Sequence, residues 1–96
     1  MPLAKYRWRI TKDHISEGEA VGVEGPSNLD PDLSLKDGQR FRMDDDDGEV
    51  YYYGVIAGDY DGFEPLDDFG TGNAGCTSIW YWEVADGAEK GEWAVL

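Results

Sequence analysis

The chain has 96 residues, a net charge of −13 at pH 7 and 13 aromatic side chains. A chain of this length forms a single domain, residues 1–96, that buries about 60 to 65% of the surface its unfolded form exposes, which excludes a second core and a deep cleft between two lobes. Because carboxylates repel phosphates, direct binding to nucleic acid or to an anionic membrane is disfavoured.

The charge is unevenly distributed along the sequence. Residues 1–42 hold seven acidic and seven basic groups, whereas residues 43–96 hold fourteen acidic groups and a single basic one, Lys90. All of the net charge therefore comes from the second half. Such asymmetry favours a charged binding face over a general solubilising surface.

Cysteine content and hydropathy indicate the compartment. Cys76 is the only cysteine, so an intramolecular disulfide is excluded and a secreted, disulfide-stapled scaffold is disfavoured. No apolar run approaches the roughly 18 to 20 residues of a membrane helix, and the N-terminus lacks the apolar core of a signal peptide. We therefore expect a cytoplasmic protein without a membrane partner.

The first predicted element is a strand over residues 5–10. Strict alternation places three apolar side chains on one face and three cations on the other: Tyr6, Trp8 and Ile10 against Lys5, Arg7 and Arg9. We expect the cations to pair with carboxylates on neighbouring strands. Residues 20–24 predict a short second strand before the Gly25-Pro26 break.

Residues 30–38 contain the one predicted helix. Asp30 is a suitable N-cap, Pro31 suits the first helical position and Gly38 provides a stop signal. This helix would have two turns at most.

Residues 40–56 predict a β-hairpin with an acidic tip. Phe41 and Met43 share one face of the first arm, while the second arm is apolar or aromatic on both faces, as expected of a central strand covered from both sides. Asp47-Gly48 supplies the positive φ angle of a tight turn. Four consecutive aspartates, residues 44–47, cannot be buried, so we expect all four to stand in water at this turn.

Residues 58–75 are rich in Gly and Asp and have no periodicity, which predicts a long functional loop. Residues 77–84 and 92–96 predict two closing strands. The sequence therefore predicts a mainly β fold of five to six antiparallel strands, bent into a small barrel or roll, with at most one short helix.

Residues 41–49 (FRMDDDDGE), 63–70 (FEPLDDFG) and 73–77 (NAGCT) resemble a group of small, uncharacterised acidic proteins from actinobacteria and their mobile elements. The resemblance covers most of the chain. It implies no catalytic or binding residues, and adds only a context in which inhibitors encoded by phages or mobile elements occur.

Metal and cofactor chemistry have weak sequence support. Asp59, Asp61, Gly62 and Asp68 match four positions of an EF-hand calcium loop, but Ala57 occupies the first position and no paired helices are predicted. One His and one Cys cannot make the usual zinc ligand set. We predict no cofactor and no tight metal site. A weak cation site at Asp59, Asp61 and Asp68 is the one metal-binding hypothesis that the sequence leaves open.

Catalysis is not predicted either. A lone Cys76 beside a strand is expected to be a small buried apolar residue, and His14 an exposed loop residue. The aromatic runs 51–53 and 80–82 are expected to build the core. We therefore predict that the protein is not an enzyme.

The leading functional hypothesis is a small acidic protein-interaction module. It would imitate nucleic acid and inhibit a basic DNA- or RNA-binding protein, since 13 net charges equal those on roughly 22 Å of duplex. The predicted partner-binding residues are Asp44, Asp45, Asp46, Asp47, Glu49, Asp59, Asp61, Glu64, Asp67 and Asp68. The alternatives are a small ligand- or weak cation-binding domain that uses the loop from Asp59 to Asp68, and an acidic surface kept for solubility.

Overall fold

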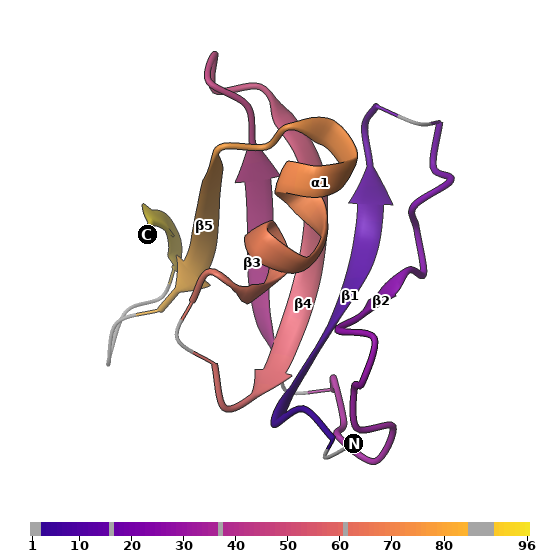
Figure 1. The fold of residues 1–96 in the computed structure, drawn as a ribbon. Coiled ribbons are helices and arrows are strands. Elements are labelled where there is room, and N and C mark those ends of the chain that lie inside the picture. Colours follow the sequence, from indigo (N-terminus) through magenta and orange to yellow (C-terminus); the bar gives the residue numbers. More distant parts are fainter. Residues whose placement is uncertain (1–2, 16, 37, 61, 85–89) are drawn as a thin grey trace.

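A computed structural model describes residues 3–15, 17–36, 38–60, 62–84 and 90–96. The described part contains six strands and one short helix (Figure 1): β1 Tyr6–Asp13, β2 Glu24–Gly25, β3 Gln39–Asp44, β4 Val50–Gly58, α1 Thr71–Ala74, β5 Ser78–Glu83 and β6 Glu92–Val95. The strands form one antiparallel sheet in the order β2-β1-β4-β3-β5-β6.

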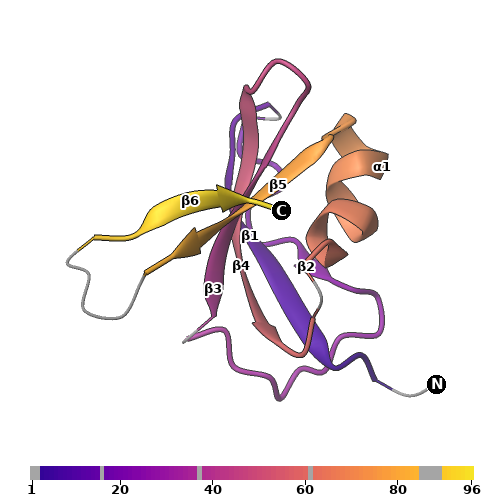
Figure 2. The same ribbon diagram turned by 90° about the vertical axis from the view of Figure 1, so that its left-hand side faces the viewer.

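The sheet is open, with β2 and β6 at its two edges. The prediction of a mainly β, antiparallel fold with at most one short helix is confirmed, but the sheet does not close into a barrel. Figure 2 shows the twisted sheet nearly edge-on, with the helical residues on one side and β6 crossing on the other. The two faces of the sheet therefore have different surroundings.

The core lies between the sheet and a helical segment of residues 64–74, in which a π-helical turn, Leu66–Gly70, leads into α1. The Phe69 ring packs at 5.5 Å from the Trp8 ring and 4.9 Å from the Tyr52 ring, between ring centroids. Cys76 is also buried here. The buried apolar side chains are Trp8, Ile10, Ala20, Phe41, Met43, Tyr52, Ile56, Leu66, Phe69, Cys76, Ile79 and Tyr81.

The central position predicted for the second arm of the hairpin is confirmed. β4 pairs with β1 on one side and with β3 on the other. The alternation predicted for β1 is also confirmed, because Trp8 and Ile10 are buried while Arg7 and Arg9 reach Glu24 on β2. β2 itself is only two residues long, so the strand predicted over 20–24 is mostly wrong.

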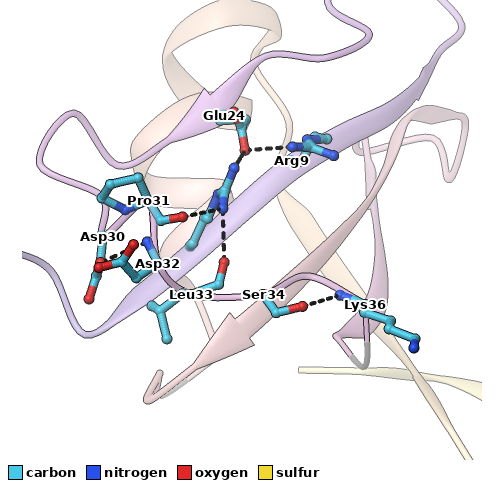
Figure 3. A network of polar contacts seen from close by, with 9 residues as sticks. Arg9, Glu24, Asp30, Pro31, Asp32, Leu33, Ser34 and Lys36 are labelled. Carbon is cyan, nitrogen blue, oxygen red and sulfur yellow. Dashed lines mark hydrogen bonds and ion pairs between the residues drawn. The ribbon is translucent and has the colours of Figure 1, made fainter.

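The helix predicted over residues 30–38 is wrong where the structure describes this stretch, because turns replace it. The Asp30 carboxylate accepts the N–H of Asp32 at 2.9 Å, forming a local turn instead of a helical cap. The Arg7 guanidinium binds the carbonyl oxygens of Pro31 and Leu33 at 3.2 and 2.8 Å, the region shown in Figure 3. A helix would need those carbonyls for its own amides, so a distant cation overrides the local helix signals.

The helical residues lie instead in the stretch 58–75, for which we predicted a loop. Leu66, Phe69 and Gly70 face the sheet and are buried. These positions follow the helical i, i+3, i+4 spacing, but just two of them carry large apolar side chains, which is too few to make a visible period in the sequence. The segment ends at Gly75, whose φ of 70° is the left-handed conformation common after helices.

Candidate functional site

The turn between β3 and β4 is built around Asp45. Its Oδ1 accepts the backbone N–H of Asp47 and of Glu49, each at 2.9 Å, while Gly48 adopts the positive φ of 81° expected for this turn. The hydrogen bond from the Glu49 amide is the main cause that holds the pKa of Asp45 below its usual value. Asp45 therefore stabilises the turn, and its negative charge is partly committed to the backbone.

Asp44 does not stand in water, so the expectation that all four aspartates are solvent-exposed is wrong. Its side chain is buried, with Oδ1 at 3.5 Å from Arg42 Nε. The β3–β4 register shifts here: Met43 pairs with Tyr52 and Asp44 pairs with Val50, so Tyr51 is the extra residue on β4. Burial raises the pKa of the Asp44 carboxyl despite the opposing charge of Arg42, so Asp44 is a structural residue unable to meet a partner's surface.

The remaining charges of the turn form what we call the acidic tip: Asp46, Asp47 and Glu49. All three side chains are exposed, and none forms an ion pair with the described part of the chain. The tip protrudes beyond the end of the sheet at the top of Figure 1. These carboxylates are free to meet a partner.

The other predicted partner-binding residues do not join the acidic tip. β4 runs from the tip to its far end near Asp59, and its nine residues span about 25 to 30 Å. Asp59 and Asp67 are exposed and Glu64 is half-buried. Asp61 lies outside the described residues. The predicted acidic surface is therefore divided between two ends of the molecule.

Asp68 has a structural role between β1 and the helical segment. Its Oδ2 accepts hydrogen bonds from the Tyr6 hydroxyl at 2.7 Å and from the Trp8 indole N–H at 3.0 Å. Glu64 likewise accepts the backbone N–H of Gly62 at 2.8 Å. The described residues contain no group of three or more His, Cys, Asp or Glu arranged to hold a metal ion. No contact here favours the cation-binding alternative.

The predictions for Cys76 and His14 are confirmed. Cys76 is 1% exposed, and burial together with the charges of Asp44 and Asp45 raises its thiol pKa to about 11. The ionised, nucleophilic form of this thiol is therefore scarce at neutral pH. His14 is exposed, and its ring meets the Tyr53 ring edge-on at 5.6 Å.

The sequence reasoning missed the second face of the sheet, which lies opposite the helical segment. Only part of each aromatic run is in the core: Tyr52 and Tyr81 are buried and Tyr51 packs against the core, whereas Tyr53, Trp80 and Trp82 lie half-buried on the opposite face. We define the second face by eight side chains: Lys12, Arg40, Arg42, Tyr53, Val55, Trp80, Trp82 and Trp93. The signal in the sequence was the Arg pair at 40 and 42 and the Trp pair at 80 and 82, each two residues apart on neighbouring strands.

Cations and rings alternate from strand to strand across this face. One row follows the paired positions Lys12, Tyr53, Arg42 and Trp80. The Arg42 guanidinium is clamped between two indoles, at 4.5 Å from the Trp80 centroid and 5.1 Å from the Trp93 centroid. Arg40 lies 4.9 Å from the Trp82 centroid in the next row. Cation–π contacts thus hold the basic side chains and fix the rings.

A pocket of about 390 Å³ opens on the second face. Tyr53 and Trp93 supply aromatic surface, with ring centroids 5.9 Å apart, and Val55 adds an aliphatic side chain. Lys12 and Arg40 are its charged residues. Among the residues that the structure describes, the lining is Thr11, Lys12, Arg40, Phe41, Tyr53, Gly54, Val55 and Trp93, with no acidic residue.

The fold and these surfaces define a small, mainly β domain: an open six-stranded antiparallel sheet, covered on one face by one helical segment, with an acidic hairpin tip and a cationic, aromatic second face. The chain matches no protein-family model, and searches of curated proteins and of solved structures found no significant match. The resemblance to small acidic actinobacterial proteins stays a prediction. No helix within the described residues is long and apolar enough to cross a membrane.

Proposed function

We propose that this protein is an acidic interaction domain that binds a basic, nucleic-acid-binding protein and competes with that protein's nucleic acid. The observation that carries the proposal is the exposure of Asp46, Asp47 and Glu49 at one protruding turn, where no cation of the described residues forms an ion pair with them. Carboxylates in this position can meet the side chains that otherwise bind phosphates.

The distribution of ion pairs supports the same proposal. Asp46, Asp47 and Glu49 form no ion pair within the described part of the chain, whereas the carboxylates of Glu24 and Asp44 do. The net charge of −13 lies on a body of 38 × 34 × 21 Å. This charge equals that of roughly 22 Å of duplex. The charge density is therefore similar to that of the nucleic acid it would replace.

The structure refines the residues that a partner would contact. Asp44 and Asp45 are not among the proposed contact residues, because Asp44 is buried and Asp45 stabilises the turn. Asp59 and Asp67 are exposed but lie away from the tip, so they contribute to the long-range field rather than to the contact.

The proposal is tested with a variant that neutralises the tip without disturbing the turn: Asp46→Asn, Asp47→Asn and Glu49→Gln. A matched variant, Glu17→Gln, Glu19→Gln and Asp32→Asn, removes the same charge from exposed positions elsewhere. Each protein is immobilised and exposed to lysate of the native host at low and high salt. Retained proteins are then assayed for nucleic-acid binding with and without this protein added.

We expect the parent and the matched variant to retain a basic protein at low salt, to release it at high salt and to displace its nucleic acid. The tip variant should do none of these. Equal loss in both variants would show that only total charge matters, and retention of a protein whose nucleic acid is not displaced would refute the mimicry.

A further inference from the structure

We propose that the pocket on the second face is a binding site for a small planar aromatic molecule that carries one anionic group. The pocket volume of about 390 Å³ falls within the range of small-molecule sites, roughly 300 to 1,000 Å³. This inference is independent of the proposed function, because it uses the opposite charge and a different surface.

The first observation is the state of the two cations that line the pocket. The side chains of Lys12 and Arg40 form no ion pair and no hydrogen bond with the described part of the chain. The chain has 21 acidic residues, and its other strand arginines, Arg7, Arg9 and Arg42, do have carboxylate partners. Two unpaired cations on one pocket without an acidic side chain attract an anion.

The second observation is that neighbouring rings hold these cations in place. Lys12 Nζ lies 5.8 Å from the Tyr53 ring centroid, and the Arg40 guanidinium lies 4.9 Å from that of Trp82. A Lys or Arg side chain that lies over an aromatic ring still has N–H groups that point away from the ring and can donate hydrogen bonds to a ligand. The charged groups are therefore positioned before a ligand arrives, which reduces the ordering cost of binding.

The third observation concerns the walls of the pocket. Tyr53 and Trp93 expose part of their rings, and Trp93 is fixed in turn by Trp82 at 5.3 Å and by the clamped Arg42 at 5.1 Å. Rings held in this way provide a preformed surface for stacking a flat molecule. An aromatic ring against these walls would place its anionic substituent toward Lys12 and Arg40.

The charge of the whole molecule determines the size of the ligand. A polyanion would extend over the surface and be repelled by the net charge of −13. A single anionic group inside the pocket interacts mainly with the nearest cations, because exposed charges are screened beyond about 8 to 10 Å. A small monovalent or divalent anion is therefore favoured over an oligonucleotide. Aryl carboxylates and nucleoside monophosphates share the required chemistry.

The test titrates the purified full chain with two sets of probes and follows backbone and indole N–H signals by NMR. The first set shares one ring and differs in charge: naphthalene-2-carboxylate, naphthalene-2-carboxamide and 2-naphthylmethylammonium. The second set is uridine 5′-monophosphate and uridine. Comparison of the two anions distinguishes an aryl carboxylate site from a nucleotide site.

We expect each anionic probe to bind more tightly than its neutral counterpart, with signal changes concentrated at Thr11, Tyr53, Val55 and Trp93. Lys12→Gln and Arg40→Gln should each weaken the anionic probes by about 5-fold, the scale of one exposed charge pair, and leave the neutral probes unchanged. Lys36→Gln is the matched control: it removes one exposed cation outside the pocket and should have no effect.

Three outcomes would overturn the proposal: equal affinity for the carboxylate and the carboxamide, an equal loss in Lys36→Gln and Lys12→Gln, or signal changes away from the pocket. A thymidine oligonucleotide is titrated in the same way. If it binds more tightly than the monophosphate, the second face is a nucleic-acid-binding surface and the proposal of a small-ligand site is wrong. Both substituted pocket residues are exposed, so the variants are expected to fold, and their NMR spectra verify this.

Discussion

The indole N–H of Trp8 donates a hydrogen bond to Asp68 Oδ2 at 3.0 Å, and this contact joins the buried face of β1 to the helical segment. The Tyr6 hydroxyl donates to the same oxygen at 2.7 Å. Trp8 is only 2% exposed, so its N–H would be costly to leave without an acceptor. One carboxylate thus satisfies two aromatic donors and anchors the helical segment.

Replacement of Asp68 should therefore destabilise the protein. We expect Asp68→Ala to lower the free energy of unfolding by about 1 to 3 kcal/mol, because both aromatic donors lose their acceptor. Asp67→Ala removes an exposed carboxylate next to it and should change stability by less than about 0.5 kcal/mol. Urea unfolding of the two variants measures the difference, and equal midpoints would contradict a structural role for Asp68.

The ionisation of Tyr6 gives this contact a pH dependence. Burial, followed by the hydrogen bond to Asp68, raises the pKa of the Tyr6 hydroxyl well above its usual value. The unfolded chain releases this proton near pH 10 while the folded chain keeps it, so the stabilisation is complete below about pH 10 and is lost as pH rises further. We expect the stability advantage of the parent over Tyr6→Phe, measured by urea unfolding, to shrink between about pH 10 and 11.5. Tyr53→Phe, at a tyrosine that contacts aromatic rings and Lys12 but not Asp68, serves as a comparison.

Two glycines of the helical segment should respond oppositely to alanine. A Cβ at Gly70 would lie 2.6 Å from Met43 Sδ and 3.2 Å from Cys76 Cβ, whereas a Cβ at Gly72 would meet nothing within 4 Å. We expect Gly70→Ala to destabilise the protein by about 1 to 3 kcal/mol through overpacking. Gly72→Ala should stabilise it by about 0.4 to 1 kcal/mol, because the unfolded chain loses freedom. Thermal unfolding of both variants tests the close packing of this segment on β3.

Cys76 should be nearly inert in the folded protein. With a thiol pKa of about 11, its thiolate fraction at pH 8 is roughly 200-fold lower than that of an ordinary cysteine, and burial slows access further. We expect iodoacetamide to label the native protein at least about 100-fold more slowly than the urea-unfolded protein. Comparable rates would show that the region around Cys76 opens readily.

The sequence predicted those parts of the fold that depend on local pattern. The alternation around Trp8 fixes the inward face of β1, and Asp47-Gly48 specifies the turn between β3 and β4. Both signals act between residues that are close in the chain, so no knowledge of tertiary contacts is needed.

The predictions that were wrong concern residues whose structure depends on contacts with residues far along the chain. The helix signals at residues 30–38 lose to Arg7, which is 24 and 26 residues away from the carbonyls it binds. Asp44 is buried where β3 pairs with β5, opposite Ser78, which is 34 residues away along the chain. The pocket requires side chains from four strands, among them Lys12 and Trp93, and no local pattern brings these together. The exposure of the acidic tip could be predicted, because a turn that stands in water does not depend on contacts with distant residues.

The central place of β4 has a consequence for the order of folding. Its pairing with β3 joins residues 13 apart, Phe41 and Gly54, whereas its pairing with β1 joins Trp8 to Ile56, 48 residues apart. Closing the longer loop costs more chain entropy before any contact forms. The hairpin is therefore expected to be the nucleus on which β1 docks later. Core substitutions at Phe41 should mainly slow refolding, and those at Trp8 should mainly speed unfolding.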